Sequence, residues 1–457
     1  MNVLAAEWLR FVRNRTNLGI ALIAFVLLVA SAIDAGTRAT QLRERSVTRE
    51  QQWSGRLRNL AVPNAQVEAA SNATRVFEFG RTETPPLLRP MPGGLALAVR
   101  HFETLPADIG VTLESRYLDS RRNETIDSPL IGAMGAPDFS VVVALLVPLL
   151  LIGLSHGLIQ DAREQGMWRL VRAQTSSPWR VLFSALFLRL AVAIVLVAIA
   201  TAVAFALDVG SRWSDALSWL AAATLFATLW CALIGLLALP RMTAATATLA
   251  LLSVWLVTTF AVPAVLVEAA SRSDAPRSQL ATLHTIRKIQ HEVEANDRAL
   301  LAAWYTAHPQ HRPQTIAEHT FPVTYVPRYL AQDAQIVPLM RRFEQFRRER
   351  LERIEPYLAF APGPALVLFA DHLSGASARH QETYLQAIAD AEVRWREVLI
   401  PRVMSYRGLD ERDVSALAAI ELEMQAVEDS DLLPWLAAVA ILLSTLVFAG
   451  RRALLAP

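Results

Sequence analysis

Few residues in this sequence have the types and spacing that support chemistry. His284 and His291 stand seven positions apart, whereas zinc ligands on one helix are usually about four apart, as in His-Glu-x-x-His. The sequence has no Gly-x-x-x-x-Gly-Lys-Ser/Thr loop to hold the phosphates of a nucleotide, and its only lysine is Lys288. We therefore expect no catalytic residue, no metal site and no cofactor in this chain, so any ATP it uses would be bound by another polypeptide.

The most informative polar segment is IQDAREQGMWRLVRAQTSSPWR, residues 159–180, which separates two apolar runs. Gly166 permits a break in a helix, and Met167, Leu170 and Val171 then form a short apolar strip. We expect a helix, a sharp turn, a short amphipathic helix and a second turn, which make a compact knob (residues 160–180) too small to be an enzyme. Its candidate contact residues are Asp161, Arg163, Glu164, Gln165, Gly166, Met167, Trp168, Arg169, Leu170, Val171 and Arg172.

Residues 1–15 have the pattern of a helix that lies on a membrane surface. Leu4, Trp8 and Phe11, with Val12 beside them, fall on one face, and the charged side chains fall elsewhere. Such a helix is typical of the interface of a bilayer, although the arginines could also serve as a plain positive anchor on the cytoplasmic side. The candidate interfacial residues are Glu7, Trp8, Arg10, Phe11, Arg13 and Arg15.

The elements that position these residues are apolar helices. Of 457 residues, 53% are hydrophobic and 19% are charged, against roughly 25% charged in a soluble protein, and a helix of about 20 apolar residues crosses a bilayer. The sequence predicts a polytopic α-helical membrane protein with six transmembrane helices and two large extracytoplasmic insertions. The expected spans are residues 16–33, 139–159, 181–207, 214–239, 243–266 and 432–449.

The arginines of the short loops predict the orientation of these spans. Arginines precede the first span, follow the sixth, and stand between the second and third and between the fourth and fifth. Short cytoplasmic loops are enriched in arginine and lysine, so both termini are expected in the cytoplasm. This places residues 1–15, 160–180, 240–242 and 450–457 inside, and residues 34–138, 208–213 and 267–431 outside.

The two insertions differ in pattern. The first starts polar and helical, is broken by TETPPLLRPMPGG, and continues into LALAVRHFETLPADIGVTLESRYL, where one or two strands are expected, so we predict a mixed α/β insertion. The second is expected to be mainly α-helical, because apolar residues recur every three or four positions. One such stripe consists of Leu280, Leu283, Ile286, Ile289 and Val293.

The spans and the overall charge narrow the range of functions. No span carries Asp or Glu near its middle, and Arg189 stands within reach of the cytoplasmic interface, which argues against a self-powered secondary transporter or an intramembrane protease. A net charge of +2 gives no reason to expect a nucleic-acid partner. The single cysteine, Cys231, cannot form a disulfide within the chain and is expected to be buried.

The stretch DAREQGMWRLVRAQTSSPWRVLFSALFLRL resembles the permeases of type-2 ABC transporters, which have six spans. In that family an acid at the end of span two precedes Arg-Glu-x-Gly-Thr, a short helix and a Ser/Pro turn. The residues that match are Asp161, Arg163, Glu164 and Gly166, and the N-terminal Glu7, Arg10, Arg13, Asn14 and Arg15 also fit. Three residues depart from the family pattern, namely Met167 in place of Thr, Thr175 in place of Pro and Arg189 in place of a frequent Lys. These departures concern the details of individual contacts more than the family resemblance. The two insertions resemble those of a bacterial subgroup.

The resemblance implies a division of labour between chains. A separate cytoplasmic ABC ATPase dimer would bind ATP and Mg, and the helix around residues 166–173 would be the coupling helix seated in a cleft of that ATPase. A second permease protomer, either this chain or a similar one, would pair with it in the bacterial inner membrane among membrane lipids. The expected function is export of a substrate such as a peptide or an amphipathic, lipid-like product, and an extracytoplasmic partner is possible.

Three alternatives remain open from the sequence. The same assembly could transmit force to an extracytoplasmic partner without moving any cargo. The chain could instead be a membrane scaffold or sensor that works without an ATPase. A membrane enzyme is the last alternative, although no catalytic constellation supports it.

Overall fold

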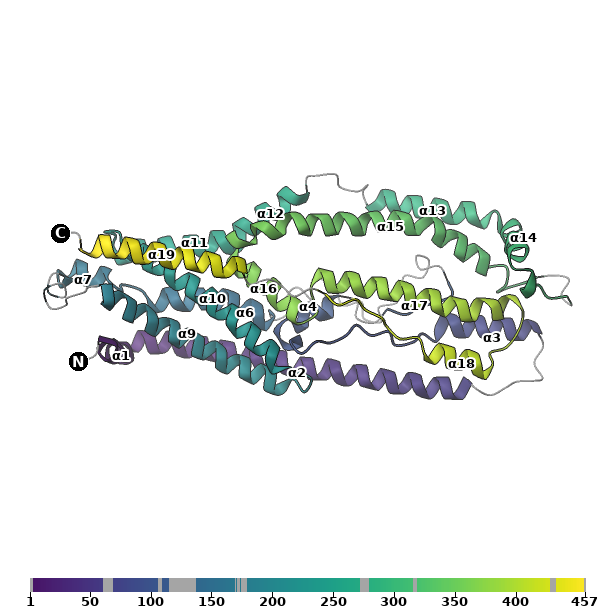
Figure 1. The fold of residues 1–457 in the computed structure, drawn as a ribbon, viewed down its shortest axis with the longest axis horizontal. Coiled ribbons are helices and arrows are strands. Elements are labelled where there is room, and N and C mark those ends of the chain that lie inside the picture. The colour runs from purple at the N-terminus through teal and green to yellow at the C-terminus, as the bar shows by residue number, and fades with distance from the viewer. Residues whose placement is uncertain are drawn as a thin grey trace.

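Helices are arranged along one long axis, with an apolar bundle at one end and a more polar module at the other (Figure 1). The computed structural model describes residues 3–60, 69–105, 109–114, 137–168, 170, 173, 179–271, 279–314, 319–427 and 433–455. Both chain ends lie at the bundle end of the molecule (Figure 1). No β-strand occurs in the described part of the chain.

The bundle is built from the apolar runs of the sequence. Four helices are long and apolar enough to cross a membrane, namely Arg15–Leu57, Trp179–Leu207, Trp213–Ala238 and Ala244–Ala270, and the apolar helices Phe139–Leu154 and Leu436–Gly450 are shorter. These match the positions of the six expected spans. The bundle elements are α1 (Val3–Arg13), α2 (Arg15–Leu60), α6 (Phe139–Leu154), α7 (Gln160–Glu164), α9 (Trp179–Leu207), α10 (Trp213–Ala238), α11 (Ala244–Leu256), the π-helix η2 (Val257–Ala261), α12 (Val262–Ser271) and α19 (Leu433–Leu455).

Helix α2 joins the bundle to the module without a break. Its 46 residues make it about 69 Å long, since each residue adds about 1.5 Å, whereas the apolar core of a bilayer is about 30 Å thick. The expectation that the first insertion begins as a helix is therefore confirmed. Movement at one end of α2 is carried along a continuous helix to the other end.

Small residues let α2 and α9 pack closely. Ala24, Leu28, Ala32, Ala35 and Ala39 form a buried stripe along α2 at helical spacing. At Gly36 a Cβ atom would stand 2.5 Å from the backbone oxygen of Ala204 and 2.7 Å from Cβ of Leu207. The absence of a side chain at Gly36 is therefore what permits this crossing.

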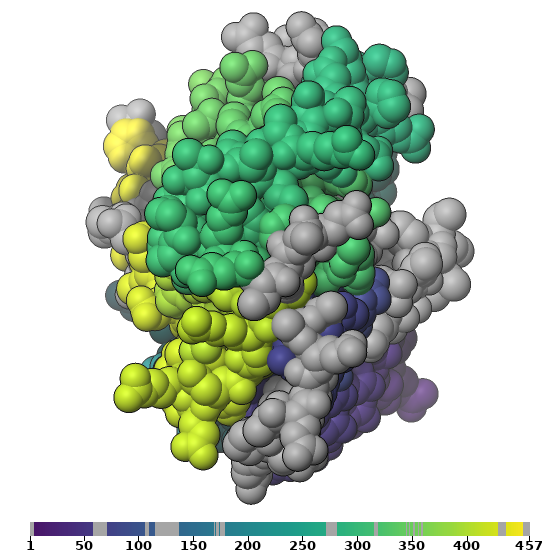
Figure 2. Space-filling view, turned by 90° about the vertical axis from the view of Figure 1, so that its right-hand side faces the viewer, coloured from purple at the N-terminus to yellow at the C-terminus, as the bar shows by residue number. Residues whose placement is uncertain are grey.

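The module consists of helices from both insertions around a second core. Its buried residues include Phe77, Tyr384, Trp395, Leu399 and Val403. The end-on view shows the helices of residues 279–354 stacked over the later helices α17 and α18 (Figure 2). The elements of the two insertions are α3 (Ala69–Thr82), η1 (Leu95–Leu97), α4 (Val99–Thr104), α13 (Gln279–Glu294), α14 (Asp297–Ala307), η3 (Pro309–His311), α15 (Val326–Ile354), η4 (Glu355–Phe360), α16 (Pro362–Leu373), α17 (Ala378–Met404) and α18 (Glu411–Ala418). Of these, η1, α4 and α16 contribute buried residues to the core of the bundle, and the others form the module.

The strands expected in the first insertion are not present in the residues that the structure describes. Residues 95–97 and 99–104 form the helical turns η1 and α4, and residues 109–114 are irregular. Leu95, Leu97, Val99 and Phe102 are all buried, so tertiary packing against the helices outweighs the β-propensity of the stretch. The second insertion is mainly helical, as the periodicity predicts.

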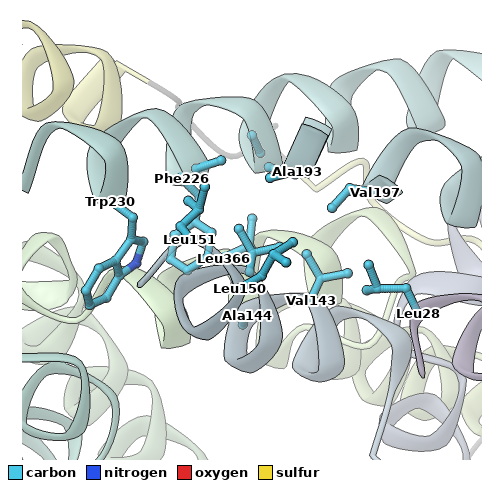
Figure 3. Packing of buried hydrophobic residues seen from close by; sticks show 14 of the residues in the cluster. Leu28, Val143, Ala144, Leu150, Leu151, Ala193, Val197, Phe226, Trp230 and Leu366 are labelled. Carbon is cyan, nitrogen blue, oxygen red and sulfur yellow. The ribbon is translucent and has the colours of Figure 1, made fainter. Parts of the chain in front are cut away.

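Helix α16 belongs to the second insertion but packs in the bundle. It contacts α6 and α10, and its Leu366 is completely buried. Figure 3 shows Leu366 in the same cluster as Leu150, Leu151 and Phe226. The second insertion is therefore not a separate lobe, because one of its helices completes the core of the bundle.

Candidate functional site

The knob begins where α6 ends at Leu154, earlier than the expected end of the span at Ile159. Gly157 has φ +66° and Gly166 has φ +69°, a conformation that favours glycine. A Cβ atom at Gly157 would also collide with the carboxylate of Asp161. Two glycines therefore make the turns on either side of α7, and the break expected at Gly166 is confirmed.

Arg163 connects the knob to the end of α10. Its Nη1 donates to the backbone oxygens of Ala238, Leu239 and Pro240 at 3.2, 3.1 and 2.9 Å. The last carbonyls of a helix have no partner within the helix and carry partial negative charge. A guanidinium at this point satisfies these oxygens and fixes α7 to the end of α10.

Glu164 makes the complementary contact with the start of α11. Its Oε1 accepts a hydrogen bond from the backbone N–H of Ala244 over 2.8 Å, and the side chain of Thr243 accepts from the N–H of Thr246. Free N–H groups and the helix dipole favour a negative charge at a helix N-terminus. Arg163 and Glu164 thus hold the two sides of the turn between α10 and α11 with charges of opposite sign.

Several knob residues remain exposed beyond this attachment. Met167 is 54% exposed and Leu170 is 56% exposed, and no neighbouring atom lies within 4 Å of a Cβ placed at Gly166. Trp168 is half-buried under the guanidinium of Arg163, whose Cζ is 5.7 Å from the ring centroid. Gln165 is exposed. The candidate residues Arg169, Val171 and Arg172, and residues 174–178, lie outside the described part of the chain.

The N-terminal helix α1 packs on α9 and α2. The residues of its expected apolar face are therefore not all in the same environment. Phe11 is buried in the bundle core, whereas Leu4, Trp8, Leu9 and Val12 are 41%, 50%, 47% and 40% exposed. The rings of Trp8 and Phe11 stack at 6.5 Å. The helix is amphipathic, but the expected grouping of Phe11 with Trp8 on an exposed apolar face is wrong, because Phe11 packs in the bundle core.

Glu7 of α1 and Arg189 of α9 are both buried where α1 packs on α9. Glu7 is therefore not on an outer face of α1. Arg189 is 8% exposed; its Nε donates to the Leu154 oxygen over 2.7 Å and its Nη1 to the Ala185 oxygen over 2.8 Å. The Arg189 side chain is thus folded inward, where it caps α6 just before the knob.

A second polar site joins the bundle to the module. The Asp138 carboxylate accepts from the backbone N–H groups of Arg100 and His101 at 2.8 and 3.0 Å. Nη2 of Arg100 donates to Asp34 Oδ2 at 2.9 Å, and Nδ1 of His101 lies 2.9 Å from Asp371 Oδ1. These contacts connect α2, α4, the start of α6 and α16, and sequence reasoning missed them because their partners lie far apart along the chain.

Electrostatics within this junction favour a charged imidazole. The buried Asp371 carboxylate beside His101 raises the pKa of that imidazole, with Asp138 adding to the effect and burial opposing it. Burial raises the pKa of Asp138, while its two backbone hydrogen bonds oppose that change. Nearby, burial lowers the pKa of His380 to about 4, with His372 and Arg89 contributing. The junction therefore contains one imidazole with a raised pKa, His101, and lies near another with a lowered pKa, His380.

The described residues offer no group of three or more His, Cys, Asp or Glu side chains placed to hold a metal. An internal cavity lined by residues such as Ser155, Gln160 and Thr248 has a volume of about 10 Å³, room for about one water molecule. Cys231 is buried, as expected. Among the described residues, the contacts at the knob are the best-defined candidate for function.

Comparison with known proteins gives one match. A family model described as a domain of unknown function, DUF3526, matches residues 279–419. No curated protein and no solved structure matches the chain. The matched region runs from α13 through α18, so the similarity covers the helices of the second insertion, α16 among them, and it includes neither α3 nor the knob.

Proposed function

We propose that this chain is the transmembrane permease subunit of an ATP-driven exporter of the type-2 ABC class, and that a separate cytoplasmic ATPase drives it. The observation that carries the proposal is the geometry of the knob. Arg163 and Glu164 attach it to both sides of the α10–α11 turn, while Met167 and Leu170 stay exposed. Those two apolar side chains suit a cleft on a partner protein better than contact with water.

This attachment gives a route by which a push on the knob would move the bundle. The three carbonyls held by Arg163 and the N–H held by Glu164 are parts of the helix backbone. A displaced knob therefore carries the ends of α10 and α11 with it. Since α10 contacts α16, and α16 contacts η4 of the second insertion, the same movement would pass from the bundle toward the module.

The proposed arrangement has six spans, with both termini in the cytoplasm and the module outside. The four long apolar helices and the two shorter ones support this number. Two such protomers, either identical or similar, would stand in a bacterial inner membrane among its lipids, above an ABC ATPase dimer that binds ATP and Mg. The permease itself carries out no ATP hydrolysis in this proposal, and its cargo would be a peptide or an amphipathic, lipid-like product.

A second function, transmission of force without cargo, is favoured by one specific observation. The continuous α2 and the α16 contact connect the bundle firmly to a large module. In that case ATP hydrolysis in the partner would change the shape of the module and act on an extracytoplasmic protein. A scaffold or sensor without an ATPase is the remaining alternative, and it predicts no motor partner.

Copurification with an ABC ATPase from the native host cell tests the proposal. We expect a tagged chain to retain that ATPase, and Met167→Asp/Leu170→Asp to weaken the association by roughly tenfold or more, since buried apolar contacts at an interface contribute about 1–2 kcal/mol each. Gln165→Asp is the matched control, because it adds a charge to the same knob without removing an apolar side chain. No ATPase association in the wild type, or equal retention by both variants, would contradict the proposal.

Transport assays separate the exporter from the force transmitter. Inside-out vesicles that contain the assembly should accumulate a labelled candidate peptide or lipid when ATP is added. ATP-dependent changes in protease sensitivity of the module, with no accumulation across a panel of amphipathic substrates, would favour force transmission. A chain that functions without any associated ATPase would favour the scaffold or sensor.

A further inference from the structure

A basic hollow lies beside α1, where that helix turns into α2. It has a volume of about 500 Å³ and is lined by Ala6, Leu9, Arg10, Arg13 and Asn14. In Figure 1, α1 is seen nearly end-on across the start of α2. The hollow therefore adjoins the point where the apolar part of α2 begins.

The positive charge of this hollow is only partly neutralised. Nη1 of Arg10 is 3.7 Å from Oε1 of Glu7, but the Arg10 side chain is 62% exposed whereas that of Glu7 is 11% exposed. Arg13 is exposed and makes no ion pair with any residue in the described ranges. Two guanidinium groups at one hollow suit a phosphate, which accepts charge-assisted hydrogen bonds from arginine.

Apolar side chains surround the basic hollow. Trp8 and Leu9 of α1 are exposed, as are Leu18 and Leu22 of α2, the last by 62%. A free phosphate ion would gain nothing from these side chains, whereas the acyl chains of a phospholipid would cover them. The combination of a cationic hollow with adjoining apolar surface selects a lipid over a soluble anion.

We propose that this hollow binds the headgroup of an anionic phospholipid from the adjacent leaflet, and that its occupancy is relayed to the knob. Arg10 lies 3.7 Å from Glu7, and helix α1, which carries both residues, packs on α9, the helix of Arg189. A phosphate that engages Arg10 leaves the Glu7 carboxylate to Arg189. Arg189 donates to the oxygen of Leu154, the residue at which α6 ends and the knob segment starts. The lipid thus strengthens the cap that sets the direction of the knob.

Spin-labelled lipids test the binding site in the full-length protein. In nanodiscs of phosphatidylcholine we expect spin-labelled phosphatidylglycerol to be immobilised in preference to spin-labelled phosphatidylcholine. The variant Arg10→Gln/Arg13→Gln should reduce this preference by roughly fivefold or more, because each arginine near an anionic surface contributes a factor of about five. The charge-conserving Arg10→Lys/Arg13→Lys should retain most of it.

A matched control separates a defined site from general positive charge. Arg180→Gln/Arg241→Gln removes two exposed arginines that do not line the hollow, and we expect it to keep the preference. Equal losses in both glutamine variants, or no loss in Arg10→Gln/Arg13→Gln, would overturn the proposed site. Displacement of the labelled lipid by inorganic phosphate as effectively as by short-chain phosphatidylglycerol would overturn the choice of a lipid.

Thiol labelling tests the relay without any ATPase. Cys231 is buried, so Met167→Cys provides one accessible thiol on the knob. We expect its maleimide labelling rate to change at least twofold between phosphatidylcholine and phosphatidylglycerol nanodiscs, and the change to disappear when Glu7→Gln is added. Equal rates in both lipids would overturn the relay. Only the role of the knob as a motor contact comes from the proposed function, so the two proposals can fail separately.

Discussion

Arg43 of α2 and Asp208 of the α9–α10 loop form a two-point ion pair at the end of the bundle where the first insertion packs on it. Nε of Arg43 donates to Oδ1 of Asp208 over 2.7 Å, and Nη2 donates to Oδ2 over 3.2 Å. The same guanidinium donates to the oxygens of Met91 and Pro92 at 2.9 and 2.6 Å. The Asp208 side chain is 0% exposed. One arginine therefore fixes α2, the α9–α10 loop and the first insertion to each other.

Replacement of Arg43 should destabilise the protein strongly. Arg43→Met leaves the buried Asp208 carboxylate without its partner, which costs about 3–5 kcal/mol. Thermal unfolding in detergent should show a large fall in melting temperature. Arg45→Met is the matched control on the same helix, because Arg45 is exposed. Similar melting temperatures for the two variants would show that the ion pair contributes little.

A methyl group at Gly36 should separate α2 from α9. Gly36→Ala places an atom against the backbone of Ala204, and overpacking of this kind costs about 1–3 kcal/mol. Gly19→Ala on the same helix meets no atom within 4 Å and should stabilise the helix by about 0.5–1 kcal/mol. Unfolding in a denaturant series measures both. Opposite signs are expected, and a neutral Gly36→Ala would contradict the close crossing.

Alteration of the knob should separate binding of the motor from coupling to it. Glu164→Ala removes the contact with Ala244, worth about 1 kcal/mol, and Gly166→Ala strains a backbone with φ +69°, at about 1–2 kcal/mol. The double variant should still insert and retain the ATPase. Its ATP hydrolysis should no longer respond to substrate, and transport should fall. Gln165→Ala serves as the control, and normal coupling in the double variant would refute the assignment.

The contact between His101 and Asp371 should make stability depend on pH. Asp371 raises the pKa of His101 in the folded state, so the stabilisation is full below the unfolded value of about 6.5 and is lost as pH rises through the raised pKa. The melting temperature of the wild type should exceed that of His101→Gln most at about pH 6 and least at about pH 9. The His380 imidazole, whose pKa burial lowers to about 4, acts in both proteins and cancels in the difference. A difference that grows with pH would contradict this contact.

Local sequence patterns predicted the elements better than they predicted the partners of polar residues. The apolar runs correspond to helices because a continuous apolar stretch leaves few other ways to satisfy backbone groups. The turn at Gly166 was predicted because its cause is local. Asp161, Arg163 and Glu164 were predicted to contact a motor, yet Arg163 and Glu164 have partners on α10 and α11. Their neighbours Met167 and Leu170 are exposed, and these are the two side chains that the proposed function assigns to contact with an ATPase.

The long-range contacts between polar residues could not be predicted from the sequence, and the reason is physical. His101 and Asp371 stand in different insertions, and no period or motif relates them. The stretch of residues 95–104 has apolar residues that suit strands or helices, and its burial against neighbouring helices decided the outcome. The one available signal for α16 was its short apolar run after Pro362, within an otherwise polar insertion.

Helix α16 also affects how the protein can be made. It follows α6 and α10 in the chain, yet its Leu366 fills the space between them. The ribosome delivers α6 and α10 long before this helix exists, so the bundle cannot be completed in the order of its synthesis. Until α16 has been synthesised and packs against them, α6 and α10 expose the apolar surface that Leu366 covers in the folded protein. A chain that ends before residue 373 would therefore leave that apolar surface of α6 and α10 uncovered.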